Sequence, residues 1–301
     1  MIHFNISKIL IPVDFSETSL LAIKHGAYMG KSTGASVHIL HVINAHYVSQ
    51  DIFLPVVNIQ DQGKIEGVAN TKLAQLAAEV KAEFGIDVQT MIKVGPPSNE
   101  ISKVAKEIHA SIIVMGTHGY SPVEELVIGS TALKVITKSP CPTMAMSSAA
   151  KHNGYKKILI PIDTSGNSRQ KVNYTLELAK KFGSSVHAIA LLTHSEDSEK
   201  PAMELILHQI DKLAKEKGVE YHSEVISDVK NRATSTVAQI EKAGADLVVI
   251  MTDQDAELSG FFLGPYSQQV IHLSKVPVIA IKPEDLFVND STILAGTSGG
   301  R

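Results

Sequence analysis

The chain has 301 residues, of which 44% are hydrophobic and 20% are charged, and its formal net charge at pH 7 is −3. This length suits two domains of about 150 residues, and the composition is typical of a globular protein with two hydrophobic cores. Acidic and basic residues are balanced in both halves, which disfavours nucleic acid as a partner. No apolar run reaches the roughly 18 residues of a membrane helix, so we expect no membrane partner.

Two further features favour a cytoplasmic location. The chain contains one cysteine, Cys141, which excludes a disulfide framework within the chain and suggests a reducing compartment. The N-terminal residues also lack the layout of a signal peptide.

The first half alternates short apolar runs with helical patterns. Strands are predicted at 9–13, 37–42, 88–93, 112–115 and 143–146, and helices from the N-cap Ser16 to about residue 32, then at 65–84, 97–109 and 130–138. Gly34 ends the first helix, and residues 44–64 form a long irregular connection. This alternation predicts a parallel, doubly wound sheet with right-handed crossovers.

The second half repeats the first. Residues 8–14 (KILIPVD) return as residues 157–163 (KILIPID), an offset of 149, and a second register with an offset of 135 aligns Gly129 with Gly264. The repeat predicts a domain over 1–150, a second domain over 151–283 and a C-terminal tail over 284–301.

A glycine-rich segment lies where a ligand site of such a fold is expected. Gly116-Thr117-His118-Gly119 directly follows the fourth strand, and Gly129-Ser130-Thr131 opens the next helix. Glycines let backbone N–H groups approach a polyphosphate, and a helix start favours anions. Ligands of doubly wound sheets bind at the carboxyl ends of the strands, where Asp14 and Gly116 lie. The alternative, in which these glycines only form turns, stays open at this point.

Together these motifs resemble the universal stress protein family, in particular its nucleotide-binding branch. The resemblance rests on Pro12-Val13-Asp14, on His41-Val42, on the glycine segment and on the Ser139-Pro140-Cys141-Pro142 stretch before the last strand. It covers residues 5–147 and 154–283 as a tandem pair. It implies two domains, each with a five-stranded parallel sheet of order 3-2-1-4-5 flanked by helices.

The resemblance also implies a ligand, ATP with Mg²⁺. Asp14 and the backbone of Val42 would contact adenine and ribose, while the glycines and the hydroxyl residues would hold the phosphates. The complete set of predicted nucleotide-binding residues is Pro12, Val13, Asp14, Val42, Met115, Gly116, His118, Gly119, Gly129, Ser130 and Thr131. For Asp14 a catalytic role, and for His118 a plain loop position facing solvent, are the alternatives. No catalytic residue and no metal ligand is predicted.

The second copy of the glycine segment is degraded. With the 135 offset, Gly116 becomes Met251, Gly119 becomes Gln254 and Ser130 becomes Pro265. Side chains then occupy positions where backbone must approach phosphate, and Pro265 lacks both an N–H and a hydroxyl. Asp253 and Asp255 add negative charge that opposes a polyphosphate. We therefore predict that only the first half binds ATP.

Three functions are compatible with this pattern. The first is a non-catalytic stress-response or signalling protein in which ATP is a conformational or assembly ligand. The second is a slow ATPase or phosphotransfer enzyme that uses the same pocket, and the third is a scaffold that binds no nucleotide. Residues 1–150 contain no arginine, and no general base can be named, so binding is favoured over turnover.

The last strand of each half is a candidate for assembly. We predict that the strand at 143–146 pairs with a strand from Val278 to Lys282, which would make an intrachain pseudo-dimer and cover two sheet edges. A homodimer of two chains is a further possibility.

Overall fold

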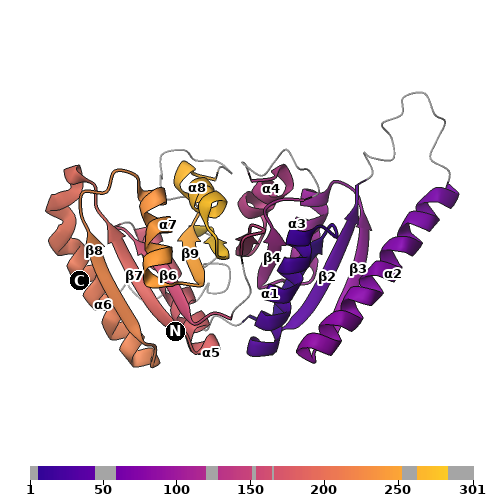
Figure 1. Cartoon of the computed structure of the whole chain (residues 1–301), viewed down its shortest axis with the longest axis horizontal. Coiled ribbons are helices and arrows are strands. Elements are labelled where there is room, and N and C mark those ends of the chain that lie inside the picture. The colour runs from indigo at the N-terminus through magenta and orange to yellow at the C-terminus, as the bar shows by residue number, and fades with distance from the viewer. Residues whose placement is uncertain are drawn as a thin grey trace, which may run out of the picture.

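The computed structural model describes residues 6–44, 59–119, 128–150, 154–164, 166–252 and 263–283. Its strands form one continuous layer that is covered by helices, with the first half at one end of the molecule and the second half at the other (Figure 1). Within the described residues, no helix is both long enough and apolar enough to cross a membrane.

The first half has the predicted order of elements. They are β1 (Lys8–Val13), α1 (Glu17–Thr33), β2 (Ser36–Ile43), α2 (Ile59–Phe84), β3 (Val88–Val94), α3 (Pro97–Glu107), β4 (Ile112–Gly116), α4 (Ser130–Lys138) and β5 (Thr143–Met146). Helix α2 begins at Ile59, although the sequence predicts a start near residue 65. Gly63 looks like a helix breaker in the sequence, but one glycine costs a helix only about 1 kcal/mol, which 26 residues readily offset.

Helix α1 has the predicted caps at both ends. The Ser16 hydroxyl accepts a hydrogen bond from the backbone N–H of Ser19 at 3.3 Å, and Glu17 places a negative charge in the first turn. At the other end Gly34 has φ 74°, and its N–H donates to the carbonyl of Gly30 at 2.8 Å. The start of α1 is therefore fixed directly after β1, which determines where the residues between them lie.

The second half repeats this order. Its elements are β6 (Lys157–Ile162), α5 (Gly166–Phe182), β7 (Ser185–Leu191), the 3₁₀ helix η3 (His194–Glu199), α6 (Lys200–Lys217), β8 (Tyr221–Ile226), α7 (Arg232–Ala243), β9 (Leu247–Met251), α8 (Pro265–Leu273) and β10 (Val278–Ile281). Only η3 has no counterpart among the described elements of the first half.

All ten described strands belong to one sheet, in the order β3-β2-β1-β4-β5-β10-β9-β6-β7-β8. Each half therefore has the expected 3-2-1-4-5 order, with parallel neighbours throughout. At the centre β5 and β10 pair antiparallel, with Met144 opposite Ile279. This pairing joins the two halves and covers the edges of both last strands.

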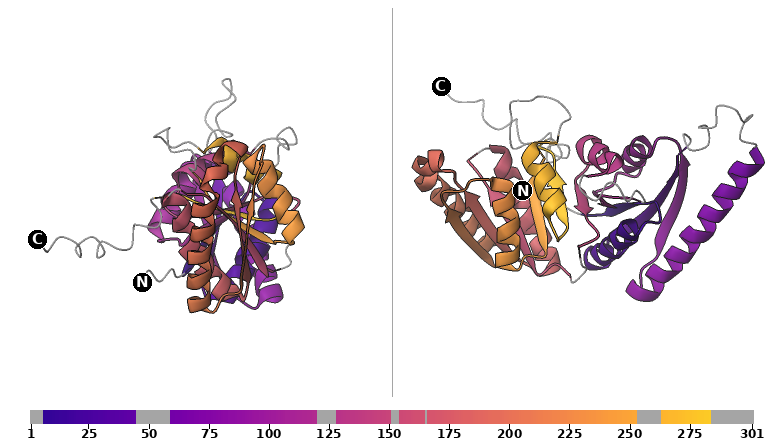
Figure 2. Two further views of the ribbon diagram at one scale, coloured as in Figure 1. Left: turned by 90° about the vertical axis from the view of Figure 1, so that its left-hand side faces the viewer. Right: turned by 45° about the horizontal axis from the view of Figure 1, so that its top comes forward.

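The helices divide the interior into two cores, one on each face of the sheet (Figure 2). Helices α1, α2, α5 and α6 cover one core, and α3, α4, α7 and α8 cover the other. The first core runs across the boundary between the halves, where the ring of buried Tyr155 lies 5.5 Å from that of Tyr28 and 5.0 Å from that of Phe182. The Tyr155 hydroxyl also lies 2.8 Å from Nδ1 of His25 in α1. Side-chain packing as well as strand pairing thus holds the halves together.

Candidate functional site

Asp14 directly follows β1, and the start of α1 holds its carboxylate. Oδ1 of Asp14 accepts hydrogen bonds from the backbone N–H of Ser16 at 3.0 Å and from the Ser16 hydroxyl at 2.5 Å. Phe15, between them, has φ 68°, a conformation that is uncommon for a bulky residue and that is found preferentially at functional sites. These bonds fix the orientation of the carboxylate. Its second oxygen, Oδ2, takes part in neither bond.

The glycine segment after β4 lies against that second oxygen. A Cβ on Gly119 would be 2.5 Å from Oδ2 of Asp14, and a Cβ on Gly116 would be 2.8 Å from the Cβ of Thr18. The Thr18 hydroxyl donates a hydrogen bond to the carbonyl of His118. Because real Cβ atoms do not approach this closely, glycine at both positions is what allows the β4 loop to contact the start of α1.

His118 presents a buried ring nitrogen at the same place. Its Nδ1 is 2.8 Å from the Thr117 hydroxyl, and that hydroxyl also lies 3.2 Å from the carbonyl of Met146. The other ring nitrogen, Nε2, takes part in neither contact. That Nε2 is buried and has no hydrogen-bond partner among the described residues. The side chain is therefore not simply exposed to solvent.

The end of β2 forms the neighbouring wall. Val13 pairs with His41 in the parallel register of β1 and β2, which places Asp14 beside Val42. Nδ1 of His41 donates to the carbonyl of Val13 at 2.8 Å, and its ring lies 4.6 Å from that of Phe15. The ends of β1 and β2 are thus held together by side chains as well as by the sheet.

The start of α4 completes the arrangement. The Gly129 N–H donates to the carbonyl of Thr117 at 2.8 Å, so the start of this helix lies next to the end of β4. Gly129 caps α4 without a side-chain hydrogen bond, and the first turn has no acidic residue. The first N–H groups of α4 therefore have no side-chain acceptor from the cap, and Ser130 and Thr131 add hydroxyls to the same turn. Residues 120–127, which connect Gly119 to this helix, lie outside the described part of the chain.

Not every predicted residue presents a side chain here. Pro12 and Val13 are buried strand residues, and Met115 is only 5% exposed and packs in the core beneath α3 and α4. From these three positions only the backbone is available to a ligand at the strand ends.

The second half has the same backbone hydrogen bond after its fourth strand but different residues at the start of the following helix. The carbonyl of Thr252 accepts from the N–H of Gly264 at 3.3 Å, as Thr117 does from Gly129. However, the first residue of α8 is Pro265, which has no N–H to offer an anion. Met251, at the position of Gly116, is fully buried in the first core, so the prediction that its side chain lies where backbone approaches phosphate was wrong. The other predicted residues of this loop, Asp253, Gln254 and Asp255, lie outside the described residues.

Two further residues distinguish the second half from the first. Neither was predicted from the sequence. Lys171 is completely buried in α5, at the position of Ala22 under the 149 offset, and its Nζ donates to the Ser168 hydroxyl at 3.0 Å. Burial lowers the pKa of Lys171 to about 8, although nearby Asp163 favours the charged form. Tyr266 stands at the position of Thr131, and its hydroxyl lies 3.0 Å from that of Thr236. The lysine aligned with a core alanine is a signal in the sequence from which this difference could have been predicted.

Comparison with known proteins places the chain in a family. The model of the universal stress protein family matches residues 5–146 and 154–282. Universal stress protein MJ0531 of Methanocaldococcus jannaschii is 34% identical over 148 residues, which are 48% of this chain and 84% of that protein. Universal stress protein YxiE of Bacillus subtilis is 31% identical over 146 residues, 46% of this chain and 97% of that protein.

A solved structure extends the likeness to the tandem arrangement. The crystal structure of a universal stress protein from Archaeoglobus fulgidus shares the fold with a TM-score of 0.72 at 23% identity, over 93% of this chain and 97% of that one. The family model, by matching each half separately, agrees with the internal repeat of the sequence. This chain belongs to the universal stress protein family and carries two copies of its domain.

Proposed function

We propose that this protein binds ATP in its first half only and that the nucleotide acts as a conformational or assembly ligand. The observation that carries the proposal is the convergence of three segments at one edge of the sheet: the end of β1, the loop after β4 and the start of α4. In doubly wound sheets, ligands bind at this edge, where the strand order reverses.

The residues present fit an adenine nucleotide in two respects. The close approach of Gly119 to Asp14 leaves backbone rather than side chains along the floor of the site. The buried Nε2 of His118 also lacks a partner among the described residues, so a ligand hydroxyl or amine would satisfy it. We assign adenine and ribose to Asp14 and the Val42 backbone.

The phosphates belong, in this proposal, at the start of α4. Its uncapped N–H groups and the hydroxyls of Ser130 and Thr131 favour an anion there, with the backbone of Gly116, Gly119 and Gly129 alongside. Because residues 1–150 contain no arginine, we propose that Mg²⁺ accompanies the nucleotide and offsets its charge. The same lack of a fixed guanidinium favours binding over rapid hydrolysis.

The second half, in this proposal, is a structural partner that binds no ATP. Pro265 removes an N–H at the start of α8, and Tyr266 replaces the hydroxyl residue Thr131 by a much larger side chain. With β5 paired to β10, the two halves would act as a pseudo-dimer with one ligand site. A cytoplasmic location and a homodimer of two chains stay predictions, and light scattering with and without ATP tests the second.

Isothermal titration of the nucleotide-free full chain tests the proposal. We expect one ATP per chain with Mg²⁺, and weaker binding of cyclic AMP, which lacks the polyphosphate that α4 would hold. A phosphate-release assay on the same sample separates binding from turnover. Absence of ATP binding, two equivalent sites per chain, or rapid hydrolysis would each contradict a named part of the proposal.

A further inference from the structure

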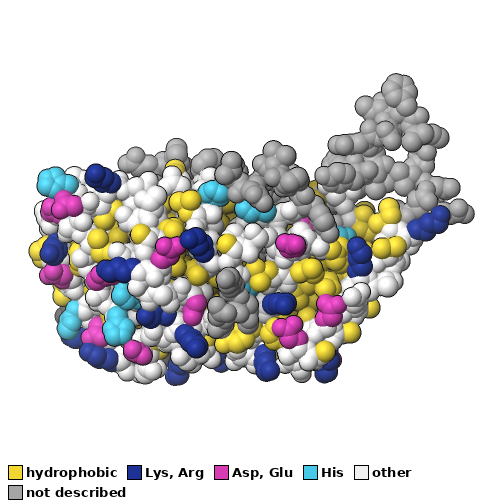
Figure 3. Space-filling view, in the orientation of Figure 1, with side chains coloured by type: hydrophobic (Ala, Val, Ile, Leu, Met, Phe, Trp, Pro, Cys, Tyr) yellow, Lys and Arg dark blue, Asp and Glu magenta, His cyan; other side chains and the backbone are white. Residues whose placement is uncertain are grey.

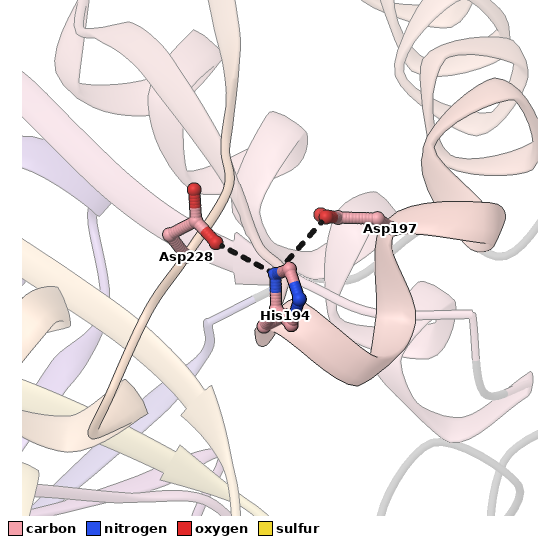
Figure 4. A group of neighbouring side chains, drawn as sticks. All are labelled: His194, Asp197 and Asp228. Atoms are coloured by element: carbon pink, nitrogen blue, oxygen red, sulfur yellow. Dashed lines mark hydrogen bonds and ion pairs between the residues drawn. The ribbon is translucent and has the colours of Figure 1, made fainter.

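A cluster of metal-ligating side chains lies in the second half. His194 and Asp197 belong to η3, which follows β7, and Asp228 lies between β8 and α7. The two carboxylates approach the imidazole from either side (Figure 4). Among the described residues, this is the one group of three or more histidine, cysteine or acidic residues close enough together to share a metal ion.

The two distances from His194 are close to an edge of a metal coordination polyhedron. Nδ1 of His194 is 3.1 Å from Oδ1 of Asp228 and 3.6 Å from Oδ2 of Asp197, and all three ligand atoms lie within 4.8 Å of one another. In a tetrahedral site with metal–ligand distances of about 2.1 Å, neighbouring ligand atoms are about 3.4 Å apart. Both carboxylates face the same nitrogen, whereas one N–H forms a well-aligned hydrogen bond with only one of them.

The backbone holds the two loops of this cluster together. The N–H of Leu192 donates to the carbonyl of Ile226 at 2.9 Å, and the N–H of Val229 donates back to the carbonyl of Leu192 at 3.0 Å. The nearest described guanidinium, that of Arg232, is bonded to Glu196 rather than to the cluster. The cluster carboxylates thus lie on two loops that backbone hydrogen bonds hold together.

We propose that His194, Asp197 and Asp228 bind a divalent first-row transition metal ion such as Zn²⁺, with water in the remaining positions. One imidazole nitrogen and two carboxylate oxygens suit Zn²⁺ or Mn²⁺ better than Ca²⁺, which takes six to eight oxygen ligands. The three side chains are 89%, 48% and 76% exposed, which leaves room for water or a further ligand. The ion would join the loop after β7 to the loop after β8.

Competition between the full chain and a chromophoric chelator for Zn²⁺, without nucleotide, tests this site. The chain has 13 histidines, so background binding must be subtracted with matched variants. His194→Gln and Asp228→Asn each remove one ligand. His222→Gln is the matched control, because His222 is also exposed, at 58%, and lies 3.0 Å from a carboxylate of Glu220, with no third ligand close enough among the described residues. Far-ultraviolet circular dichroism of the metal-free variants establishes that each is folded.

We expect one Zn²⁺ per wild-type chain, and affinity at this site reduced at least about tenfold in His194→Gln and Asp228→Asn but unchanged in His222→Gln. Zn²⁺ should also raise the melting temperature of the wild type and of the control, but not that of His194→Gln. Equal Zn²⁺ affinity and stoichiometry in wild type and His194→Gln would overturn the proposal. Because no nucleotide is present, the result is independent of ATP binding in the first half.

Discussion

The two halves of this protein share backbone hydrogen bonds at their strand ends but differ in the side chains that lie there. After the fourth strand of each half, a threonine N–H donates to the last strand, from Thr117 to Met146 at 2.8 Å and from Thr252 to Ile281 at 2.9 Å. In both halves the carbonyl of the same threonine accepts the N–H of the glycine that caps the next helix. These hydrogen bonds therefore belong to the fold and do not require an open site.

The side chains at the strand ends account for the difference. In the first half, Gly119 lets backbone lie against Asp14, while in the second half Tyr266 and Pro265 open the helix that corresponds to α4. The second half also buries Lys171 where the first half has Ala22. Under the one-site proposal, a few substitutions remove the ligand surface of the second half and leave the architecture intact. On the face shown in Figure 3, charged side chains of both signs are spread over both halves.

The largest expected effect is that of Gly119→Val on ATP affinity. A branched side chain would occupy the space beside Oδ2 of Asp14, only 2.5 Å from the new Cβ, and so we expect a loss of at least about a hundredfold. The matched control is Gly264→Val in the second half, where the nearest atom is the Thr252 carbonyl oxygen at 3.6 Å. Titration calorimetry should give wild-type affinity for the control. A similar loss in both variants would contradict the one-site proposal.

Asp14→Ala should weaken ATP binding by about tenfold to a hundredfold, the range for losing one hydrogen bond to a charged group. Asp163 follows β6 as Asp14 follows β1, so Asp163→Ala is the corresponding change in the second half. We expect that variant to bind ATP as the wild type does. If Asp163→Ala lost affinity instead, the second half would have to contribute to the site.

Lys171→Met should stabilise the protein at pH 7. The pKa of Lys171 is about 8 in the folded chain against 10.5 when exposed, a difference equivalent to about 3 kcal/mol, and a buried apolar side chain avoids this cost. We expect a gain in the free energy of unfolding of about 1–3 kcal/mol in urea titrations. Lys180→Met, an exposed change in the same helix, should alter it by less than about 0.5 kcal/mol.

The same substitution should change the dependence of stability on pH. Between pH 8 and 10.5 the unfolded chain binds more protons at this lysine than the folded chain, so wild-type stability gains from rising pH in this window. The difference between Lys171→Met and the wild type should therefore be greatest below pH 8 and shrink above it. A difference that stayed constant across this window would show that the ammonium charge is not the cause.

The smallest expected effect concerns His38 in β2. Burial, with a contribution from Lys8, lowers the pKa of His38 below 6.5, so the folded chain resists protonation more than the unfolded chain. The free energy of unfolding therefore decreases as the pH falls through about 6.5, because the unfolded chain takes up a proton at this histidine more readily. In urea titrations at acid pH, His38→Gln should reduce that decrease.

Much of the architecture follows from local signals in the sequence. Helix α4 and strand β5 have the predicted bounds, and Ser16 and Gly34 cap α1 as expected. Such features depend on residues a few positions apart, through caps, backbone conformation and apolar periodicity. The largest difference from the prediction is at the start of α2, where a single local signal was outweighed by the rest of a long helix. Helix α3 also ends at Glu107 rather than at residue 109.

The contacts of the candidate site depend on residues far apart in the chain. The sequence placed Asp14 and the glycine segment at strand ends, but the contact of Asp14 with Gly119 and the bond from Thr18 to His118 join residues about a hundred positions apart. The buried position of Nε2 in His118 likewise results from packing around the loop. The strand order predicts that Asp14 and the glycine segment lie near each other at the carboxyl edge of the sheet. It does not predict which of their atoms are in contact.

By itself, the sequence determined a duplicated α/β domain and the asymmetry of the glycine segment, because repeats, periodicity and glycine positions are properties of the chain. The strand order of each half was expected from the resemblance to the universal stress protein family. Only the tertiary structure decided the antiparallel register of β5 and β10, the burial of Lys171 and the meeting of His194 with Asp228. The physical reason is that burial and long-range contact depend on how whole layers pack, and a linear pattern does not specify which side chains then share a space.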